Sequence, residues 1–493
     1  MWRMIDLEHL EKYRENNRIE AKLALGGLPH SIWETYCAFA NTLGGIILLG
    51  VEEKKDKTLH PVNLPDPGRL IREFWEIVND SKKISVNILS VQDVQEEIVD
   101  GCHIIVITVP RAQRYDRPVY MDGDPFMGSY RRNGEGDYRC VREDVEAMLR
   151  DAQIHTRDMA LLKELELSAL DVSSVARYRR RMEHCRPNHA WEKDTDTEFL
   201  CRAGAAGRSD DGTVHPTAAG LLMFGRVDEI RREFPAYRLI YRECEGPGLT
   251  ENFSLISGGK GWSGNVFDFY FIVYDRIARG LCLPGAEVGW DAGGKKDVAG
   301  KTDTGDKTEA DEDPAVCQAL REALANCLTN ADYYGRQGVV VTRKRDEVSF
   351  SNPGGFRIDP GRAVKGGISD PRNEALVRLF HLVDIGNRTG SGLSGIYRVW
   401  RSHGWKRPVI YEEFEPERIT MVLAIQEQDD RKMVIDYLTE RVQASAEEIA
   451  KALGIRRAKT IAYLEELAAE ELVEALGEYP YKIYRIKSFE LFG

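Results

Sequence analysis

REALANCLTNADY, residues 321–333, is the stretch from which the fold of the central part of this chain can be worked out. It continues a helical pattern that starts at Pro314, since proline suits the first position of a helix. Glu322, Asn326 and Asn330 are spaced four residues apart and share one polar face. A carboxylate and a carboxamide one turn apart can orient a water molecule and hold Mg²⁺ against a triphosphate. A solvated helix face has the same pattern, so the elements that follow decide between the two interpretations.

Two glycine-bearing elements follow this helix. SNPGGFR (351–357) comes after a pair of apolar-alternating strand patterns, and Asn352, Gly354 and Gly355 would let a base approach the backbone closely. IGNRTGSGLSGIYRVW (385–400) places glycines just before a helix whose N-terminus can bind phosphate. The order of helix, glycine turn and glycine loop predicts a nucleotide site.

Residues 316–400 resemble the divergent GHKL-type ATP-binding domain of bacterial proteins described as transcriptional regulators, which are often labelled RecG-helicase-like. The resemblance implies ATP and Mg²⁺ as cofactors. It implies that Glu322 would orient water if ATP is hydrolysed and that Asn326 would bind Mg²⁺. The other nucleotide-binding residues that it implies are Asn330, Asp332, Asn352, Gly354, Gly355, Arg388, Gly390 and Gly392. Asn352 stands where hydrolysing GHKL enzymes have an aspartate, so we expect binding rather than rapid hydrolysis.

The N-terminal residues 1–152 alternate helical and strand patterns, and apolar runs at 45–51 and 103–109 predict buried strands. Four segments carry a family resemblance: ENNRIEAK (15–22), AFANTLGGIILLGVEE (38–53), RPVYMDG (117–123) and GSYRRNGE (128–135). They resemble the Schlafen-type Alba-like domain, which implies nucleic-acid binding. On this resemblance Arg131 and Arg132 would lie on a strand that faces phosphate.

The same resemblance raises a second function. In Schlafen ribonucleases, acidic residues at matching positions bind a divalent metal and activate water for phosphodiester cleavage. Here those positions hold Glu15, Glu20 and Glu52 or its neighbour Glu53. The alternative function is therefore an ATP-gated, metal-dependent nuclease acting on RNA or single-stranded DNA, in antiviral defence. The simpler interpretation, which we expect, is that Glu20 forms a structural salt bridge with Lys22 and that the protein is no nuclease.

Residues 429–493 are predicted to form a winged helix. A capping box at 445–448 opens its second helix, and its third helix begins with basic residues. The candidate nucleic-acid-binding residues are Arg456, Arg457, Lys459 and Thr460 at the start of that helix and Lys482 on the wing. Four glutamates on the same third helix favour a protein-binding winged helix as the alternative.

Three further regions complete the predicted domain order. Residues 153–287 indicate a helical connector and an αβ unit, and 314–428 the GHKL-like domain. Between them, 288–313 holds almost no large apolar residue, which is typical of a flexible insertion or lid. This insertion contains GGKKDVAGKT, which imitates a P-loop. We reject that motif because Lys295 stands where its first glycine belongs and no apolar strand precedes it.

Composition sets limits on the function. A net charge of −12 argues against a chain that coats nucleic acid over its whole surface, although local basic patches remain. The nine cysteines are never spaced as CxxC, so we expect reduced thiols rather than zinc sites or disulfides. No stretch reaches roughly 18 uncharged apolar residues, and the charged N-terminus is unlike a signal peptide. We therefore expect a cytoplasmic protein with no membrane partner.

The sequence thus predicts an α+β multidomain protein with an N-terminal Alba-like αβ domain, a central GHKL-like α/β sandwich and a C-terminal winged helix. We expect an ATP-responsive transcriptional regulator that binds DNA, or RNA, as a homo-oligomer. ATP would act by shifting populations, ordering the 288–313 insertion and changing how the nucleic-acid modules are presented. A scaffold whose winged helix only builds an oligomer is a further alternative.

Overall fold

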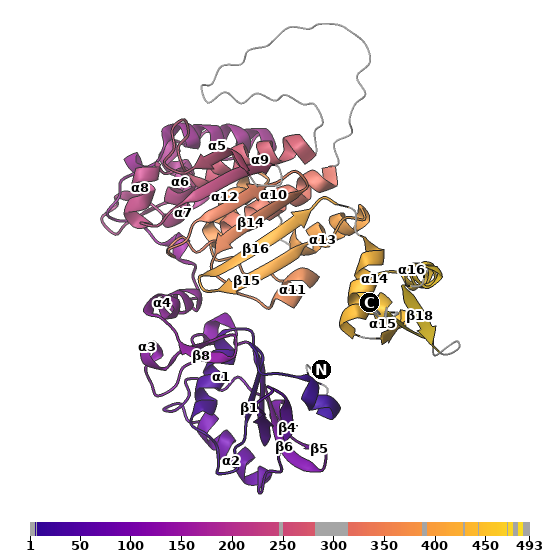
Figure 1. The fold of residues 1–493 in the computed structure, drawn as a ribbon. Coiled ribbons are helices and arrows are strands. Elements are labelled where there is room, and N and C mark those ends of the chain that lie inside the picture. Colours follow the sequence, from indigo (N-terminus) through magenta and orange to yellow (C-terminus); the bar gives the residue numbers. More distant parts are fainter. Residues whose placement is uncertain are drawn as a thin grey trace. The chain divides into compact units, whose positions relative to one another are not determined.

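The computed structural model describes residue 5 and residues 7–245, 250–281, 314–386, 392–426, 429–441, 443–470, 472–476 and 482–486. The expected insertion at 288–313 and the expected phosphate-binding residues Arg388 and Gly390 lie outside these ranges. The chain divides into two compact units, Met1–Val399 with Val409–Val422 and Trp400–Pro408 with Leu423–Gly493. Each unit is described by itself. Figure 1 traces the elements along the chain.

The first unit begins with a four-stranded sheet in the order β1-β2-β6-β5. Its strands are β1 (Ile19–Lys22), β2 (Gly45–Leu49), β5 (Val94–Val99) and β6 (Cys102–Val109), and β1 runs parallel to β2. Two helices, α1 (Ser31–Asn41) and α2 (Pro67–Val78), accompany it. The predicted buried strands at 45–51 and 103–109 are confirmed as β2 and β6.

Strand β2 is buried along its whole length because both faces of the sheet are covered. Ile47 and Leu49 pack into a core that includes α1 and α2. Ile46 and Leu48 point to the other face and pack with residues from β1, β4 (Leu59–Pro61) and β6. Two hairpins flank the sheet, β3 (Val51–Glu53) with β4 and β7 (Tyr130–Asn133) with β8 (Gly136–Arg139).

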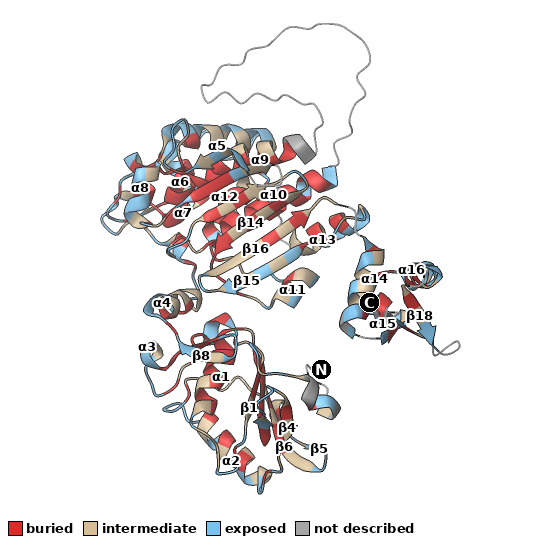
Figure 2. Ribbon diagram, viewed as in Figure 1, coloured by how far each residue is buried: buried red, intermediate tan, exposed pale blue. Residues whose placement is uncertain are grey.

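The centre of the first unit is a six-stranded sheet in the order β12-β11-β13-β14-β16-β15. The strands are β11 (Leu239–Glu245), β12 (Thr250–Ile256), β13 (Val339–Arg343), β14 (Glu347–Pro353), β15 (Val409–Phe414) and β16 (Glu417–Ala424). Helices α9 (Val266–Leu281) and α10 (Pro314–Thr329) pack against each other and against this sheet, and α12 (Glu374–Leu382) packs against α10. Figure 2 shows buried residues on the inner strand β14 and on the helices beside it, whereas the edge strand β15 is intermediate or exposed.

This sheet corrects one sequence-based expectation. Strands β11 and β12 belong to the region that we expected to form a separate αβ unit at 153–287. Instead β11 pairs in parallel with β13, with Tyr241 opposite Val341. The expected boundary therefore cuts through a sheet. The helices α5 (Val172–Cys185), α6 (Asp196–Ala203), α7 (Ala218–Phe224) and α8 (Val227–Glu233) precede it.

The second unit has its own hydrophobic core, which includes Val434, Leu438, Ile449, Leu464 and Leu467. It contains the helices α14 (Asp430–Arg441), α15 (Ala446–Leu453) and α16 (Arg457–Ala469). A three-stranded sheet in the order β17-β19-β18 joins β17 (Gln443–Ser445), β18 (Val473–Leu476) and β19 (Ile483–Ile486). The predicted capping box of the second helix is present, and Gly454 ends that helix in the left-handed conformation.

Two properties of the described residues bear on the expectations from composition. Eight of the nine cysteines lie within the described residues, the exception being Cys282, and all eight are free thiols. Within the same part of the chain, no helix is long and apolar enough to cross a membrane.

Candidate functional site

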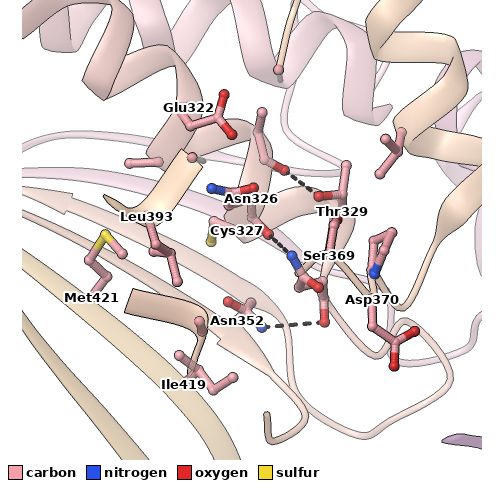
Figure 3. A pocket seen from close by; sticks show the side chains of 18 of the residues that line it. Glu322, Asn326, Cys327, Thr329, Asn352, Ser369, Asp370, Leu393, Ile419 and Met421 are labelled. Carbon is pink, nitrogen blue, oxygen red and sulfur yellow. Dashed lines mark hydrogen bonds between the residues drawn. The ribbon is translucent and has the colours of Figure 1, made fainter. Parts of the chain in front are cut away.

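A cavity of about 160 Å³ opens beside helix α10. Six residues of the predicted nucleotide site line it: Glu322, Asn326, Asn330, Asn352, Gly355 and Gly392. They come from α10 and the residue that follows it, the end of β14, the turn after it and the start of α13 (Gly392–Ser402). Figure 3 shows Glu322 and Asn326 well apart from Asp370, which lines another part of the wall. The structure thus brings together residues from three separate sequence motifs.

The polar face of α10 is held in place by local hydrogen bonds. Nδ2 of Asn330 donates to the carbonyl oxygen of Asn326 at 3.0 Å, one turn earlier. Nδ2 of Asn352 donates to the carbonyl oxygens of Asn330 at 3.4 Å and of Pro353 at 3.3 Å. Glu322 is 7% exposed and lies at the wall of the cavity. These contacts hold the side chains of Asn330 and Asn352.

The start of α13 meets Glu322 closely. A Cβ atom added at Gly392 would lie 2.1 Å from Oε1 of Glu322, a distance that no side chain tolerates. Gly395, one turn later on the same helix, would meet nothing within 4 Å. A methyl group at 392 would therefore require the Glu322 carboxylate to move, whereas one at 395 would displace nothing.

The glycines after β14 serve a different purpose from the one expected. Gly354 has a φ of +90°, and a Cβ there would lie 2.5 Å from Nη1 of Arg372. A Cβ at Gly355 would lie 2.5 Å from Oε1 of Glu417 and 2.8 Å from Oε1 of Glu412. Gly354 is not among the lining residues. These glycines make room for buried charged side chains, and the sequence pattern alone gives no sign of those partners.

Asp332 is also placed differently from the expectation. Its Oδ2 accepts from Nη2 of Arg150 at 2.8 Å, and its backbone N–H donates to the carbonyl oxygen of Pro353. It lines a separate small cavity of about 20 Å³ rather than the larger one. The structure therefore gives Asp332 a structural ion pair.

Two charged residues of the main cavity were not predicted, Arg357 and Asp370. Nη2 of Arg357 lies 3.2 Å from Oδ1 of Asp370, and Nη1 of Arg357 donates to the carbonyl oxygen of Pro371 at 3.1 Å. Arg357 comes two residues after Gly355 of the glycine turn, and this proximity is the signal that the sequence offers. Its ion pair with a residue in another loop depends on the fold.

In the N-terminal part, Glu20 is buried between two cations. Its Oε1 lies 2.5 Å from Nζ of Lys22 and its Oε2 lies 2.8 Å from Nη2 of Arg132. The expected pair of Glu20 with Lys22 is confirmed, and Arg132 adds a second partner. Both carboxylate oxygens are thereby engaged in ion pairs.

Glu15 lies near the same place. Oε1 of Glu15 accepts a hydrogen bond from the backbone N–H of Ala21 at 3.0 Å. Burial raises the pKa of Glu15, and the charges of Glu20 and Glu53 raise it further. Glu52 is exposed, so the third carboxylate that acts on Glu15 belongs to Glu53 rather than to Glu52. Among the described residues, no group of three or more His, Cys, Asp or Glu is arranged to hold a metal ion.

Arg131 and Arg132 do not face solvent, which corrects the expected phosphate contact. They are 3% and 2% exposed. Nη1 of Arg132 lies 3.0 Å from Oδ1 of Asp137, in addition to the pair with Glu20. Arg131 lies 3.5 Å from both Asp144 and Glu417. Neighbouring carboxylates therefore already hold both guanidinium groups.

The C-terminal unit offers fewer free cations than expected. Arg456 and Arg457 are exposed at the start of α16. Nζ of Lys459 lies 2.7 Å from Oδ2 of Asp430. Thr460 is fully buried, and its Oγ1 donates to the carbonyl oxygen of Arg456 at 3.3 Å, so it is not available to a nucleic acid. Nζ of Lys482 lies 5.4 Å from the centre of the Tyr484 ring.

Comparison with protein families agrees with this layout. Residues 15–141 match the family described as "Schlafen, AlbA_2", and residues 337–423 match "Putative ATP-dependent DNA helicase recG C-terminal". The chain combines a Schlafen AlbA_2 domain with a RecG C-terminal-type domain. This confirms the resemblance expected from the sequence. Residues 146–240, between these two domains, match a domain of unknown function.

Part of the chain is similar to a solved structure. It is the solution structure of the N-terminal domain of a putative ATP-dependent DNA helicase RecG-related protein from Nitrosomonas europaea, 35% identical. The match covers 27% of this chain and 90% of that chain, with a TM-score of 0.22. A crystal structure of a Corynebacterium diphtheriae protein is 17% identical and covers 96% of this chain and 92% of that chain, with a TM-score of 0.41. No curated protein matches the chain.

The main cavity belongs in part to the RecG-type domain and in part to the chain before it. Asn352, Gly355 and Gly392 lie within the matched residues, whereas Glu322 and Asn326 precede them. The RecG-type domain thus supplies the glycine turn and loop, and α10 supplies the polar helix face.

Proposed function

We propose that this chain is an ATP-binding, nucleic-acid-binding protein that acts as an ATP-responsive transcriptional regulator. The observation that carries the proposal is the meeting of Glu322, Asn326, Asn352 and Gly392 in one cavity. A polar helix face, a carboxamide after a strand and a helix N-terminus offer ligands for Mg²⁺, a base and phosphates, respectively. The match to a RecG C-terminal-type family supports the same ligand.

The residues present fit ATP with Mg²⁺. The amide oxygen of Asn326 would hold the ion, because oxygen ligands suit Mg²⁺. Asn352 would face the adenine, and the backbone N–H groups at the start of α13 would face phosphate. Glu322 would orient water and would thereby serve hydrolysis. With a carboxamide at 352, we propose binding with slow or no hydrolysis.

Nucleic-acid binding is proposed for two modules. The AlbA_2 match supports the first. For the second, we propose that the C-terminal unit is a winged helix, because three helices and a small sheet share one core. Of its predicted contacts, Arg456 and Arg457 are exposed and remain the candidates for phosphate or base contacts. A chain that carries both a nucleotide pocket and two such modules suits a regulator better than a scaffold.

The test of the nucleotide site is a matched pair of substitutions on one helix. Gly392→Ala places a methyl group against Glu322, whereas Gly395→Ala places one in open space. Calorimetric titration with ATP and Mg²⁺ should show binding by wild type and by Gly395→Ala, and a loss of at least about tenfold in Gly392→Ala, or about 1.4 kcal/mol. Asn326→Ala should lose affinity only when Mg²⁺ is present. Equal affinity of Gly392→Ala and Gly395→Ala for ATP would remove the site from this proposal.

A further inference from the structure

Three arginines of the AlbA_2 domain reach the wall of the nucleotide cavity. Arg111, Arg114 and Arg117 lie on the segment 110–119 that follows β6, and together we name them the arginine strap. Nη1 and Nη2 of Arg111 hold Oε2 and Oε1 of Glu412 at 2.6 and 2.8 Å. Such a two-pronged pair of a guanidinium with a carboxylate is strong and fixes geometry. Glu412 lies on β15, so this pair joins the AlbA_2 domain to the RecG-type domain.

The strap also contacts residues that line the cavity. The carbonyl oxygen of Phe356 accepts from Nη2 of Arg111 at 3.0 Å and from Nη2 of Arg117 at 3.2 Å. The backbone N–H of Phe356 donates to Oε1 of Glu412 at 2.8 Å. Phe356 therefore lies between the cavity and the strap. Its carbonyl oxygen accepts from the strap arginines, and its backbone N–H donates to Glu412.

Asp370 makes the second connection. Oδ2 of this cavity residue lies 2.5 Å from Nε of Arg114, and its Oδ1 is paired with Arg357. Nη1 of Arg114 also donates to the carbonyl oxygens of Asp151 and Gln153 at 2.6 and 2.8 Å. A single AlbA_2 arginine thus holds the cavity wall and the chain that connects the domains.

Hydrogen bonds connect both ends of the strap to the rest of the AlbA_2 domain. The N–H of Ala112 donates to the carbonyl oxygen of Ala40 in α1. Asn41 exchanges hydrogen bonds with the backbone N–H and carbonyl of Val119 at 2.8 and 2.7 Å. A Cβ at Gly44 would strike the carbonyl oxygen of Val109, which shows how closely the chain before β2 approaches the strap. A movement of the strap would therefore change its hydrogen bonds to α1.

The hydrogen-bond network of the strap is buried, but not every donor in the described part of it has an acceptor. Arg114 and Arg117 are 4% and 6% exposed. Nε of Arg117 and Nε of Arg357 are buried without a hydrogen-bond acceptor among the described residues. A buried charged donor that lacks an acceptor is costly, so a rearrangement that supplies one is favoured. This arrangement can change when a ligand alters the cavity wall.

We propose that occupancy of the nucleotide cavity is coupled to the AlbA_2 domain through the arginine strap. The coupling rests on the proposed ATP site and requires that the nucleotide extends to the part of the cavity wall that contains Phe356, Arg357 and Asp370. Any shift of that wall changes hydrogen bonds to all three strap arginines. By linkage, a ligand of the AlbA_2 domain changes ATP affinity by the same factor that ATP changes the affinity for that ligand.

Amide hydrogen exchange on the full chain, with and without ATP and Mg²⁺, tests the coupling. The strap offers hydrogen-bonded amides at Ala112, Asp116, Arg117 and Val119, and α10 offers amides at the cavity itself. In wild type, ATP should slow exchange both in α10 and in the strap, in the strap by at least about fivefold. Glu412→Gln keeps the side-chain shape but removes the negative charge with which Arg111 forms its ion pair. It should abolish the ATP effect in the strap and leave the effect in α10.

The matched control is the next residue, Glu413→Gln, because Glu413 is exposed on the same strand. It should behave as wild type. Should Glu412→Gln fail to fold, Arg111→Lys keeps the positive charge but cannot bridge Glu412 and Phe356 together, and it should give the same result. ATP protection in α10 without protection in the wild-type strap overturns the coupling alone, as does a normal strap effect in Glu412→Gln. Absence of protection in α10 overturns the ATP site as well.

Discussion

At the scale of single residues, Glu20 shows how a buried carboxylate can serve the fold. It is held by Lys22 and by the almost fully buried Arg132, which also pairs with Asp137. Two cations beside one carboxylate neutralise it without a metal ion. The neighbouring Glu15 is less well compensated, because burial and the charges of Glu20 and Glu53 raise its pKa while only Lys22 and one backbone hydrogen bond oppose this.

Substitution of Glu20 tests this role. Glu20→Gln leaves the Arg132 guanidinium buried with a single carboxylate partner, so we expect a loss of about 3 kcal/mol in the free energy of unfolding. Glu135→Gln is the control, since Glu135 pairs with Lys57 and both side chains are about half exposed. It should cost less than about 1 kcal/mol. Urea unfolding at neutral pH measures both values, and equal losses would show that the Glu20 pair behaves as a surface pair.

The residues that the sequence placed correctly are those fixed by local spacing. Glu322, Asn326 and Asn330 share a helix face because they are four residues apart, and all three line the cavity. Arg132 and Asp332 were placed wrongly because their partners are distant, 112 residues away for Glu20 and 182 residues away for Arg150. Nothing in the local pattern separates an exposed arginine from a buried, ion-paired one.

At the scale of elements, strands with buried faces were easier to foresee than their pairing. The run at 45–51 predicts a buried strand on its own, and β2 fulfils it. The parallel pairing of β11 with β13 joins residues about a hundred positions apart, such as Ile240 and Val340. Parallel pairing needs a long crossover, so short-range turn signals carry no information about it. The central sheet could not be assembled from the sequence for this reason.

Helix α16 carries the prediction that belongs to this scale. Arg456 and Arg457 are exposed at its start, whereas Lys459 is bound to Asp430 and Thr460 is buried. We expect Arg456→Glu with Arg457→Glu to lower duplex-DNA affinity by about 1–3 kcal/mol per contact and to reduce the salt slope by about 1 per lost phosphate contact. Fluorescence anisotropy across a salt series measures both.

The control has the same charge change on another exposed helix. Arg69→Glu with Arg72→Glu alters two exposed arginines of α2 in the AlbA_2 domain. An equal loss of affinity in both double variants would mean that net charge, or a contact made by the AlbA_2 module, contributes as much to binding as the start of α16 does. Unchanged binding by the α16 variant would favour the protein-binding interpretation of the winged helix, which the four glutamates of residues 465–471 also suit.

At the scale of the whole molecule, the chain holds two compact units with separate cores. The nucleotide cavity and the arginine strap both lie in the larger unit. Leu464 is fully buried in the core of the smaller unit. The two units can therefore be perturbed independently, one by ligand and the other by mutation.

We expect calorimetric unfolding of the full chain to show two transitions. ATP with Mg²⁺ at about 100 times its dissociation constant should stabilise the larger unit by about 2.7 kcal/mol, because only the folded cavity binds it. Leu464→Ala should instead lower the transition of the smaller unit, since truncation of a buried leucine costs about 2–5 kcal/mol. Gly392→Ala, with at least about tenfold weaker binding, should cut the stabilisation by ATP to about 1.4 kcal/mol or less and leave the effect of Leu464→Ala intact. A single transition that both ATP and Leu464→Ala move would show that the two units unfold as one, and the nucleotide would then stabilise the C-terminal unit as well.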